Sequence, residues 1–492
     1  MEHFDVLIVG AGLSGVGAAC HLRRKCPAKS FVILEGRGAM GGTWDLFRYP
    51  GVRSDSDMYT LGYSFRPWKD AKAIADGPAI LNYIRETATE FGVDKKIRYG
   101  HRVRRASWSS EEALWAVEAE TGEEKSVARL TCNFLFLCTG YYDYENGYTP
   151  EWPGVESFRG RIVHPQKWPE DLDYAGKRVV VIGSGATAVT LVPAMAERAA
   201  HVTMLQRSPT YVVSMPSQDK IANRLRARLP ARAAYFLTRW KNVLVGMFFY
   251  GLSRTRPDVM KRMIAKGVRR QLGEDYDLRH FTPEYNPWDQ RLCLVPDSNL
   301  FRSIRGGGAS VVTDQIENFT ETGLLLRSGQ RLDADIIVTA TGLVLKLMSG
   351  MQLFVDGEPV DISKRLVFKG MMYSDVPNLA FAIGYTNASW TLKCDLTAEY
   401  VCRLLKHMDR RGYDWCVARR NDPTLREEPI VNFTSGYVQR ALHTLPRQGS
   451  RRPWRLYQNY ALDLLTLRHG PVEDGTLEFG RAARGELVTS KV

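Results

Sequence analysis

Two glycine-rich segments have the spacing of turns that wrap around phosphate groups. Each follows an apolar stretch typical of a buried parallel strand, residues 4–9 and 178–182, and each precedes a predicted helix. The first glycine allows a tight turn, the second lets the backbone approach a pyrophosphate, and the helix N-terminus behind them favours an anion. The candidate contacts are Gly10, Gly12, Ser14 and Gly15 in the first segment, and Gly183, Ser184, Gly185, Ala186, Thr187 and Ala188 in the second.

The residue that ends the next predicted strand differs between the two segments and indicates which nucleotide each one binds. Glu35 lies 20 residues after Gly15 and is placed to accept hydrogen bonds from a ribose. Arg207 lies 22 residues after Gly185, where a guanidinium binds a 2'-phosphate with two hydrogen bonds, and Ser208 can donate one more. The second site is therefore predicted to prefer NADP(H) to NAD(H). The alternative is an exposed arginine at a strand end.

The segment between the two sites, residues 158–169, reads Phe-Arg-Gly-Arg-Ile-Val-His-Pro-Gln-Lys-Trp-Pro. In the form F-x-G-x-x-x-H-x-x-x-W-P it resembles the fingerprint of the type I Baeyer–Villiger monooxygenases. The matching residues are Phe158, Gly160, His164, Trp168 and Pro169. Because the segment runs between two nucleotide sites, we expect it to couple them. The alternative is a linker whose histidine and tryptophan only pack.

Three further runs extend the resemblance over residues 10–460, and toward the ethionamide monooxygenase branch of that family. They are Gly-Gly-Thr-Trp-Asp-Leu-Phe-Arg-Tyr-Pro-Gly from Gly41, Tyr-Asn-Pro-Trp-Asp-Gln-Arg-Leu-Cys-Leu-Val-Pro from Tyr285, and Gly-Tyr-Thr-Asn-Ala-Ser-Trp-Thr-Leu-Lys from Gly384. The resemblance implies FAD and NADPH as cofactors, capture of O2 as a C4a-peroxyflavin, and conversion of ketones to esters or lactones. It also implies S-oxidation of sulfides or thioamides. The alternative is a flavin-containing S/N-monooxygenase without ester-forming activity.

The resemblance also implies roles for single residues. For FAD it implies Gly10, Gly12, Ser14, Gly15, Glu35, Thr43, Trp44, Asp45, Leu46, Asp55 and Val103, and for NADP it adds Arg53 to the second glycine segment, Arg207 and Ser208. Arg291 matches the family's catalytic arginine, whose permanent charge stabilises an anionic oxygen, and Asp55 is expected to orient it. Gln290 stands where the family has a lysine that contacts the 2'-phosphate. The alternative for Arg291 is an ion pair with Asp289 or Asp297.

These sites require an α/β fold with two Rossmann-like dinucleotide-binding domains, for FAD and NADP, and a helical insert in the NADP domain. A chain of 492 residues is long enough for two or three domains. The predicted order is 1–146 for the first part of the FAD domain, 147–216 for the first part of the NADP domain, 217–284 for the insert, 285–340 for the second part of the NADP domain, and 341–492 for the rest of the FAD domain and a C-terminal tail.

Periodicity predicts the remaining elements. Residues 79–92 have an amphipathic helical pattern, and strands are expected at 97–108, 114–119 and 130–137. The run that begins at Tyr385 is expected to open a helix through Met408, whose N-terminus stabilises the negative charge of a reduced flavin. The last fifteen or so residues are expected to form a loose tail.

The net charge of +13 is concentrated in the predicted insert. Residues 217–280 contain fifteen Lys and Arg against five Asp and Glu, mixed with clusters of apolar side chains. Such a segment fits a membrane surface or an acidic partner. It also fits a helical subdomain with a solvated basic face, and this is the interpretation that we favour.

Composition limits the other classes of function. The eight cysteines are scattered without a Cys-x-x-Cys pair, which argues against a metal site or a redox disulfide. No nucleic-acid-binding module is recognisable, and the longest apolar run, 243–252, is shorter than the ~20 residues of a membrane-spanning helix. Because no leader precedes the first strand, we expect a cytoplasmic enzyme, peripheral to a membrane if the insert binds one. The expected partners are O2 and a small-molecule ketone, sulfide or thioamide; the sequence indicates no oligomeric state.

Overall fold

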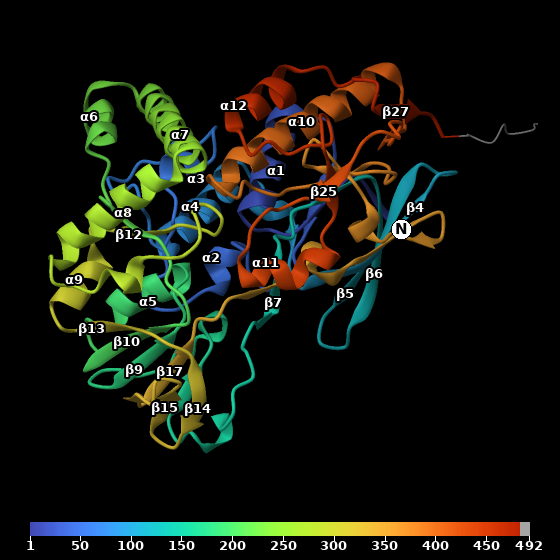
Figure 1. Cartoon of the computed structure of the whole chain (residues 1–492). Coiled ribbons are helices and arrows are strands. Elements are labelled where there is room, and N and C mark those ends of the chain that lie inside the picture. The colour runs from blue at the N-terminus through green and yellow to red at the C-terminus, as the bar shows by residue number, and fades with distance from the viewer. Residues whose placement is uncertain (483–492) are drawn as a thin grey trace, which may run out of the picture.

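Two sheets, each with one glycine-rich turn after a central strand, organise the molecule (Figure 1). The computed structural model describes residues 1–482. The larger sheet has nine strands: β1 Glu2–Val9, β2 Phe31–Leu34, β3 Ile97–Arg98, β4 His101–Ser109, β5 Leu114–Thr121, β6 Ser126–Leu137, β19 Gln352–Val355, β20 Glu358–Pro359 and β23 Leu379–Phe381. Its principal helices are α1 Leu13–Lys25, α2 Thr43–Leu46, α3 Met58–Leu61, α4 Gly77–Glu90, α10 Trp390–Arg411, α11 Gly436–Ala441 and α12 Tyr460–Asp463. We call this sheet and these helices the first unit.

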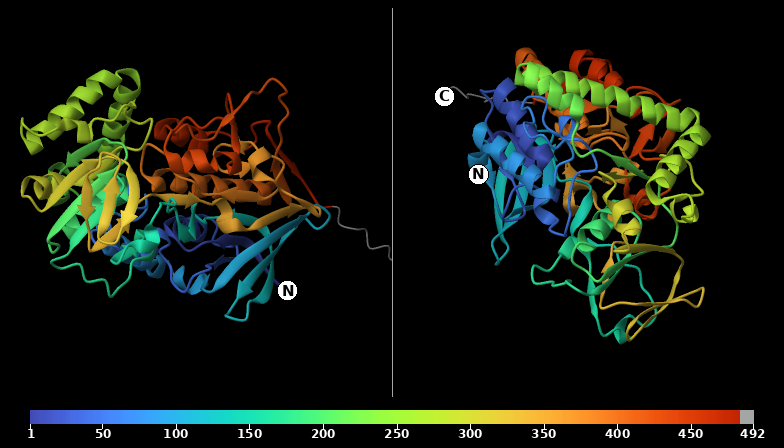
Figure 2. Two further views of the ribbon diagram at one scale, coloured as in Figure 1. Left: turned by 60° about the horizontal axis from the view of Figure 1, so that its bottom comes forward. Right: turned by 90° about the vertical axis from the view of Figure 1, so that its left-hand side faces the viewer.

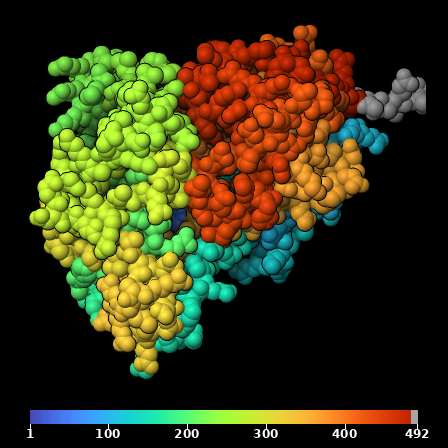
Figure 3. Space-filling model, viewed as in Figure 1, coloured from blue at the N-terminus to red at the C-terminus, as the bar shows by residue number. Residues whose placement is uncertain are grey.

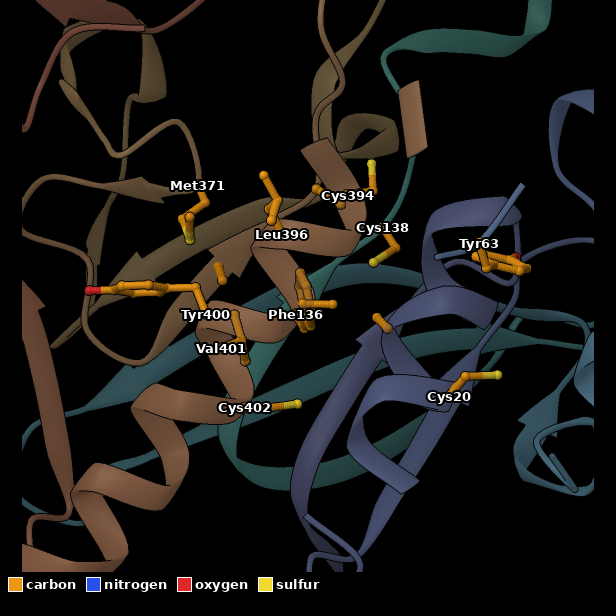
Figure 4. Packing of buried hydrophobic residues seen from close by; sticks show 14 of the residues in the cluster. Cys20, Tyr63, Phe136, Cys138, Met371, Cys394, Leu396, Tyr400, Val401 and Cys402 are labelled. Carbon is orange, nitrogen blue, oxygen red and sulfur yellow. The ribbon is translucent and has the colours of Figure 1, made fainter. Parts of the chain in front are cut away.

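Strand β1 is buried on both faces, as its continuous apolar sequence predicts. It pairs in parallel with β2 on one side and with β6 on the other. Val6 and Ile8 pack against α1 and α10, and Figure 4 shows Leu396 and Val401 of α10 beside Phe136 of β6. On the other face, Leu7 contributes to a cluster with side chains of β4 and β5. Strand β1 therefore has helices on one face, and on the other face it has the antiparallel strands β4 and β5 of the same sheet.

The smaller sheet is entirely parallel, with the order β13-β10-β9-β17-β8. We call it, together with the elements named here, the second unit: β8 Arg161–Val163, β9 Arg178–Ile182, β10 His201–Gln206, β11 Val212–Met215, β12 Cys293–Pro296, β13 Ala309–Thr313, β17 Ile336–Thr339, α5 Ala186–Met195, α9 Asn299–Arg305, and the small sheet of β14 Ile316–Thr320, β15 Gly323–Leu326 and β16 Arg331–Asp333. The chain passes between the units along β7 (Tyr142–Gly147) and β18 (Leu343–Leu345), which pair antiparallel. This pair of strands is the crossover.

Three helices form the predicted insert and contact both units (Figure 2). They are α6 Lys220–Arg228, α7 Ala231–Thr255 and α8 Pro257–Leu272. Helix α7 packs against α3 of the first unit, whereas α8 packs against β11 and α9 of the second. Within residues 1–482, no helix is long and apolar enough to cross a membrane.

Two predictions from periodicity were wrong in detail. The strand predicted at 97–108 is divided into β3 and β4, because Gly100 turns the chain with a φ of +64°. The C-terminal tail was predicted to be loose from about residue 478, but β27 (Leu477–Gly480) pairs with β24 (Trp415–Ala418). Residues 483–492 of the predicted tail lie outside the described residues.

A buried ion pair fixes α7 on the first unit. Arg239 of α7 donates hydrogen bonds of 2.8 Å to the carbonyl oxygens of Tyr59 and Gly62, and its guanidinium lies 3.6 Å from the carboxylate of Asp395 in α10. That carboxylate also lies 3.1 Å from the ring of His21 in α1. Burial raises the pKa of Asp395, but the hydrogen bond with His21 and the charges of His21 and Arg239 outweigh it and lower the pKa. Asp395 is therefore charged.

Replacing Arg239 with methionine should destabilise the protein strongly. The variant leaves Asp395 as a buried charge that has lost its arginine partner, which typically costs about 3–5 kcal/mol. We expect urea denaturation to show a loss of this size in the free energy of unfolding, and proteolysis of α7 to accelerate. The control is Lys364→Met, because Lys364 forms an exposed pair with Asp361 that contributes at most about 1 kcal/mol. Similar small losses for both variants would contradict the role of Arg239.

Candidate active site

The first glycine-rich turn has the geometry that a pyrophosphate requires. Gly10 has a φ of +102°, and a Cβ there would lie 2.5 Å from the carbonyl oxygen of Cys138. A Cβ on Gly15 would lie 1.8 Å from the carbonyl oxygen of Gly10, so neither position accepts a side chain. Gly12 precedes α1, and no side chain caps the first N–H groups of that helix. These groups are available to a phosphate, so the turn fits the dinucleotide that the sequence predicts.

Glu35 holds this turn in place from the end of β2. Its carboxylate accepts hydrogen bonds from the backbone N–H of Ala11 at 2.8 Å and of Arg37 at 2.9 Å. Burial raises the pKa of Glu35, and the two hydrogen bonds oppose that shift. Ser14 is also engaged, because its hydroxyl accepts a 3.0 Å hydrogen bond from the indole of Trp390 at the start of α10. The predicted FAD contacts of both residues stay predictions.

Asp45 lies in a cluster of arginines that its sequence neighbourhood did not reveal. Its buried carboxylate is 2.7 Å from Arg37, 3.1 Å from Arg48 and 3.3 Å from Arg85. Arg37 and Arg48 lie within eight residues of Asp45, whereas Arg85 comes from α4, which packs against α2. The side chain of Asp45 is therefore held by protein groups.

The other predicted FAD residues lie in α2, in the loop before α3 and in β4. Thr43 accepts a 2.7 Å hydrogen bond from the hydroxyl of Tyr142. Trp44 packs against the apolar core of the first unit, and Leu46 ends α2. The side chain of Val103 is buried in β4. Their contacts with the cofactor stay predictions.

The second glycine-rich turn brings the predicted NADP residues together. Gly183 has a φ of +133° and no room for a side chain beside Ala340, whereas a Cβ on Gly185 would meet nothing within 4 Å. Gly185 precedes α5, where no side chain caps the free N–H groups of Ala186, Thr187 and Ala188. Arg207 is exposed directly after β10, and the Ser184 hydroxyl donates a 3.1 Å hydrogen bond to the Ser208 carbonyl. Within the described residues Arg207 has no ion-pair partner, so its guanidinium is available.

A loop of the first unit, residues 47–53, is embedded in the second unit. Tyr49 packs in the apolar cluster that contains Val181 and Val189. A Cβ on Gly51 would lie 2.7 Å from that of Ala194 in α5, and Arg53 donates a 2.9 Å hydrogen bond to the carbonyl oxygen of Leu294. The loop therefore carries Asp55 toward β12.

Arg291 and Asp55 form an ion pair between the two units. The guanidinium lies 2.8 Å from the carboxylate, and the side chains are 41% and 29% exposed. The charge of Asp55 raises the pKa of Arg291, and burial opposes this effect. The alternative pairings are wrong: Asp289 binds Arg254 at 2.7 Å, and Asp297 accepts a hydrogen bond from the backbone of Ser217. The predicted pairing of Arg291 with Asp55 is confirmed.

A mainly apolar cavity opens beside Arg291, at the carboxyl ends of β6 and β23 and the N-terminus of α10. Among residues 1–482, Arg291 is the only charged side chain that lines it. Tyr141, which also lines the cavity, is stacked on Trp390 with ring centroids 5.0 Å apart, and burial raises the pKa of Tyr141 to about 12. The phenol is therefore protonated near neutral pH. The sequence alone did not predict this cavity, because its lining comes from four distant segments, residues 137–141, 345–348, 381–390 and 430–446, together with Arg291 and Tyr373.

The fingerprint segment lies against the crossover and does not line this cavity. His164 packs on Gly147 of β7, where a Cβ would lie 1.9 Å from the imidazole ring. Its Nδ1 accepts a hydrogen bond from the backbone of Gln166, whose amide donates to the carbonyl of Asp143 in β7. Burial lowers the pKa of His164, so the ring is neutral at pH 7. Trp168 packs on the core of the second unit, so the segment joins that unit to the crossover.

The remaining fingerprint residues pack or turn the chain. Phe158 is buried beside Phe319, and a Cβ on Gly160 would lie 2.4 Å from the ring of Phe158. The carbonyl oxygen of Pro169 accepts a hydrogen bond from the backbone of Leu172. None of these residues reaches Arg291 or the cavity.

Comparisons with known proteins identify the family. The flavin-binding monooxygenase-like family matches residues 65–409, and an NAD(P)-binding Rossmann-like domain matches residues 8–75. The chain is 56% identical over 482 residues to the FAD-containing monooxygenase EthA of Mycobacterium tuberculosis, with 98% of each protein covered. Its fold is similar to that of an oxidized steroid monooxygenase bound to NADP, with a TM-score of 0.74 and 21% identity over 97% of this chain and 100% of the other. It is also similar to OTEMO in complex with FAD and NADP, with a TM-score of 0.68 and 22% identity over 85% and 86% of the two chains.

The chain belongs to the flavin-binding monooxygenase-like family. The α/β fold with two dinucleotide-binding domains and the resemblance to the Baeyer–Villiger monooxygenases are confirmed. The flavin-binding family and the NAD(P)-binding Rossmann-like match agree with the predicted cofactors FAD and NADP(H). Two glycine turns with uncapped helix N-termini, described above, fit these two dinucleotides.

Replacing Arg207 with alanine should weaken the binding of NADPH selectively. Losing a charge-assisted hydrogen bond costs roughly 1.5–3 kcal/mol, so we expect KM for NADPH to rise at least about tenfold while KM for NADH barely changes. Steady-state kinetics with both nucleotides measures this. The control is Arg327→Ala, since Arg327 is exposed on the loop after β15. Equal effects of Arg207→Ala on both nucleotides would exclude the 2'-phosphate as its ligand.

Replacing His164 with alanine should slow two steps together. Without the imidazole the fingerprint segment loses its contact with Gly147 in the crossover. We expect both the reduction of FAD by NADPH and the oxygenation of substrate to slow, because relative motion of two domains commonly limits several steps. Stopped-flow absorbance measures both rates, and equilibrium titration checks that both cofactors still bind. Wild-type rates in both steps would show that His164 only packs.

Proposed function

We propose that this protein uses NADPH and O2 to convert ketones to esters or lactones. The observation that carries this proposal is the ion pair of Arg291 and Asp55 at the mouth of an apolar cavity. The pair lies between the two units that supply the turns for FAD and NADP(H). An ion pair in this position can act on a substrate that lies between the two cofactors.

Arginine suits this position because it cannot lose its proton. Insertion of oxygen next to a carbonyl needs a negatively charged oxygen nucleophile and passes through a negatively charged adduct. A guanidinium stabilises both, whereas a lysine in a dry pocket can become neutral. FAD supplies the activation of O2 when it is bound. Asp55 keeps the guanidinium oriented, and the protonated Tyr141 adds a hydroxyl group to the same cavity.

The lining of the cavity favours an apolar substrate with one carbonyl group. Leu345, Ile383 and Ile430 provide aliphatic surface, and Tyr373 and Phe381 provide aromatic surface. Because no other charged side chain of the described part of the protein lines the cavity, a carbonyl oxygen gains most by facing Arg291. We therefore infer an apolar ketone, bound with its hydrocarbon part away from Arg291.

Sulfur oxidation is the second candidate activity, on sulfides or thioamides. The same apolar cavity supports it, because these substrates carry no charge that the lining must compensate. Transfer of an electrophilic oxygen atom to sulfur builds no anionic adduct on the substrate, so it depends less on the guanidinium. The two activities are therefore separable. A flavin-containing S/N-monooxygenase that forms no ester is the alternative function.

Replacing Arg291 with alanine should abolish ester formation and spare sulfur oxidation. Removing one hydrogen-bond donor to an anionic oxygen typically costs about 3 kcal/mol, so we expect the rate of ester formation to fall at least about a hundredfold. Stopped-flow spectra should show that NADPH still reduces FAD, and mass spectrometry should show sulfoxide but no ester. The electrons not used in ester formation should appear as hydrogen peroxide.

Arg254→Ala is the matched control for this experiment. Arg254 forms an ion pair with Asp289, two residues before Arg291, but Arg254 does not line the cavity. We expect this variant to form ester at close to the wild-type rate. If Arg291→Ala still makes ester at nearly that rate, the proposed role of the guanidinium is wrong. If the wild-type protein oxidises sulfides but converts no ketone, the alternative function replaces the proposed one.

A further inference from the structure

Helix α7 presents apolar side chains to solvent along one face. Leu237, Leu244 and Phe248 are spaced by seven and four residues, so they form a single stripe along the helix. Phe248 is 65% exposed and Leu244 is 57% exposed. Phe236 and Val245 extend the stripe to either side and are also exposed. We call these five residues the outer stripe.

The inner face of α7 prevents the outer stripe from turning inward. Tyr235 donates a 3.0 Å hydrogen bond to the carbonyl oxygen of Tyr63, and Arg239 holds the buried contacts described above. The helix thus buries Arg239 among apolar side chains and exposes leucine and phenylalanine on its outer face, where an ordinary amphipathic helix carries polar residues. In the right-hand view of Figure 2, α7 runs along the outer edge of the molecule. Figure 3 shows this part of the chain at the surface, beside the C-terminal segments.

Positive charge surrounds the outer stripe. Residues 220–257 contain nine Lys and Arg and no Asp or Glu. Arg228 and Arg232 lie near the start of α7, and Arg256 directly follows its end. All three are exposed and form no ion pair within the part of the chain that the structure describes. An apolar stripe with free arginines at both ends is complementary to a surface that is apolar inside and anionic outside.

We propose that the outer stripe of α7 docks on an anionic lipid bilayer, with the helix lying parallel to the membrane surface. An interfacial helix buries its apolar face by about 5–10 Å, into the boundary between headgroups and acyl chains. Leucine and phenylalanine supply that face, and the arginines at the two ends contact anionic headgroups. This geometry keeps both units of the enzyme on the aqueous side of the helix.

The distribution of charge favours lipid over a second copy of the chain as the occupant. Most contacts between identical chains are two-fold, so the same surface meets itself. A two-fold contact through α7 would bring together two segments of nine basic residues each, with no acidic residue in either segment to pair with them. An anionic bilayer supplies the missing negative charge.

The test is co-sedimentation of the FAD-loaded, full-length protein with vesicles. We expect the wild-type protein to bind phosphatidylcholine vesicles that contain about one-third phosphatidylglycerol, less so as salt rises, and to bind pure phosphatidylcholine poorly. The triple variant Leu237→Gln, Leu244→Gln, Phe248→Gln should bind at least about tenfold more weakly. The second triple variant, which replaces Arg228, Arg232 and Arg256 with glutamine, should bind as weakly and lose the dependence on salt.

Matched controls change the same types of side chain elsewhere. Val127→Gln with Leu465→Gln removes exposed apolar side chains that lie outside α7, and Arg327→Gln with Arg331→Gln removes exposed charge. We expect all four variant proteins to have the Tm of the wild-type protein and to oxidise NADPH at its rate. We expect the two control variants to bind vesicles as strongly as the wild-type protein does.

Three outcomes overturn the proposal. The first is wild-type binding by the stripe variant, and the second is equal binding of the wild-type protein to neutral and anionic vesicles. The third is an absence of vesicle binding together with a wild-type oligomer that the stripe variant dissociates, as light scattering would show. That third outcome would make the outer stripe a contact between copies of the chain.

Discussion

The ion pair of Arg291 and Asp55 is the constraint on which the arrangement of the two units depends. Asp55 belongs to the first unit and Arg291 to the second. A separation of 2.8 Å between the two side chains therefore requires that the two units keep a fixed relative position. The loop 47–53 helps to fix this position, because Tyr49 is embedded in the core of the second unit. The insert also helps to fix it, because α7 packs on the first unit and α8 on the second. The site around Arg291 thus depends on how the two units and the insert pack together, and not on one sequence motif.

The fingerprint segment lies against the crossover, at a distance from the cavity. His164 contacts the crossover, the paired strands β7 and β18 along which the chain passes between the units, and Trp168 anchors the segment to the second unit. A neutral histidine wedged against Gly147 can transmit a shift of the second unit to the crossover without taking part in chemistry. We therefore expect the segment to couple the two units rather than to take part in the chemistry.

Sequence predicted what is encoded locally and missed what distant segments build together. The glycine turns, Glu35 and Arg207 could be located because strand, turn and helix follow one another at fixed spacing. The pairing of Arg291 with Asp55 came from family resemblance, since 236 residues separate the two positions. The arginine cluster around Asp45 and the cavity gave no local signal. The orientation of α7 also gave no local signal. Apolar residues occupy both of its faces, so periodicity alone does not show which face is buried.

The ion pair of Arg239 with Asp395 and that of Arg291 with Asp55 differ in how easily they break. Arg239 and Asp395 are almost fully buried, so separating them leaves a charge without solvent, and the contact is permanent. Arg291 and Asp55 keep 41% and 29% of their side chains exposed, so water compensates either charge when the pair opens. A guanidinium held in this way can turn from its carboxylate to an anionic oxygen at low cost. The protein thus places its rigid pair where the insert must stay attached, and its exchangeable pair where the proposed reaction develops negative charge.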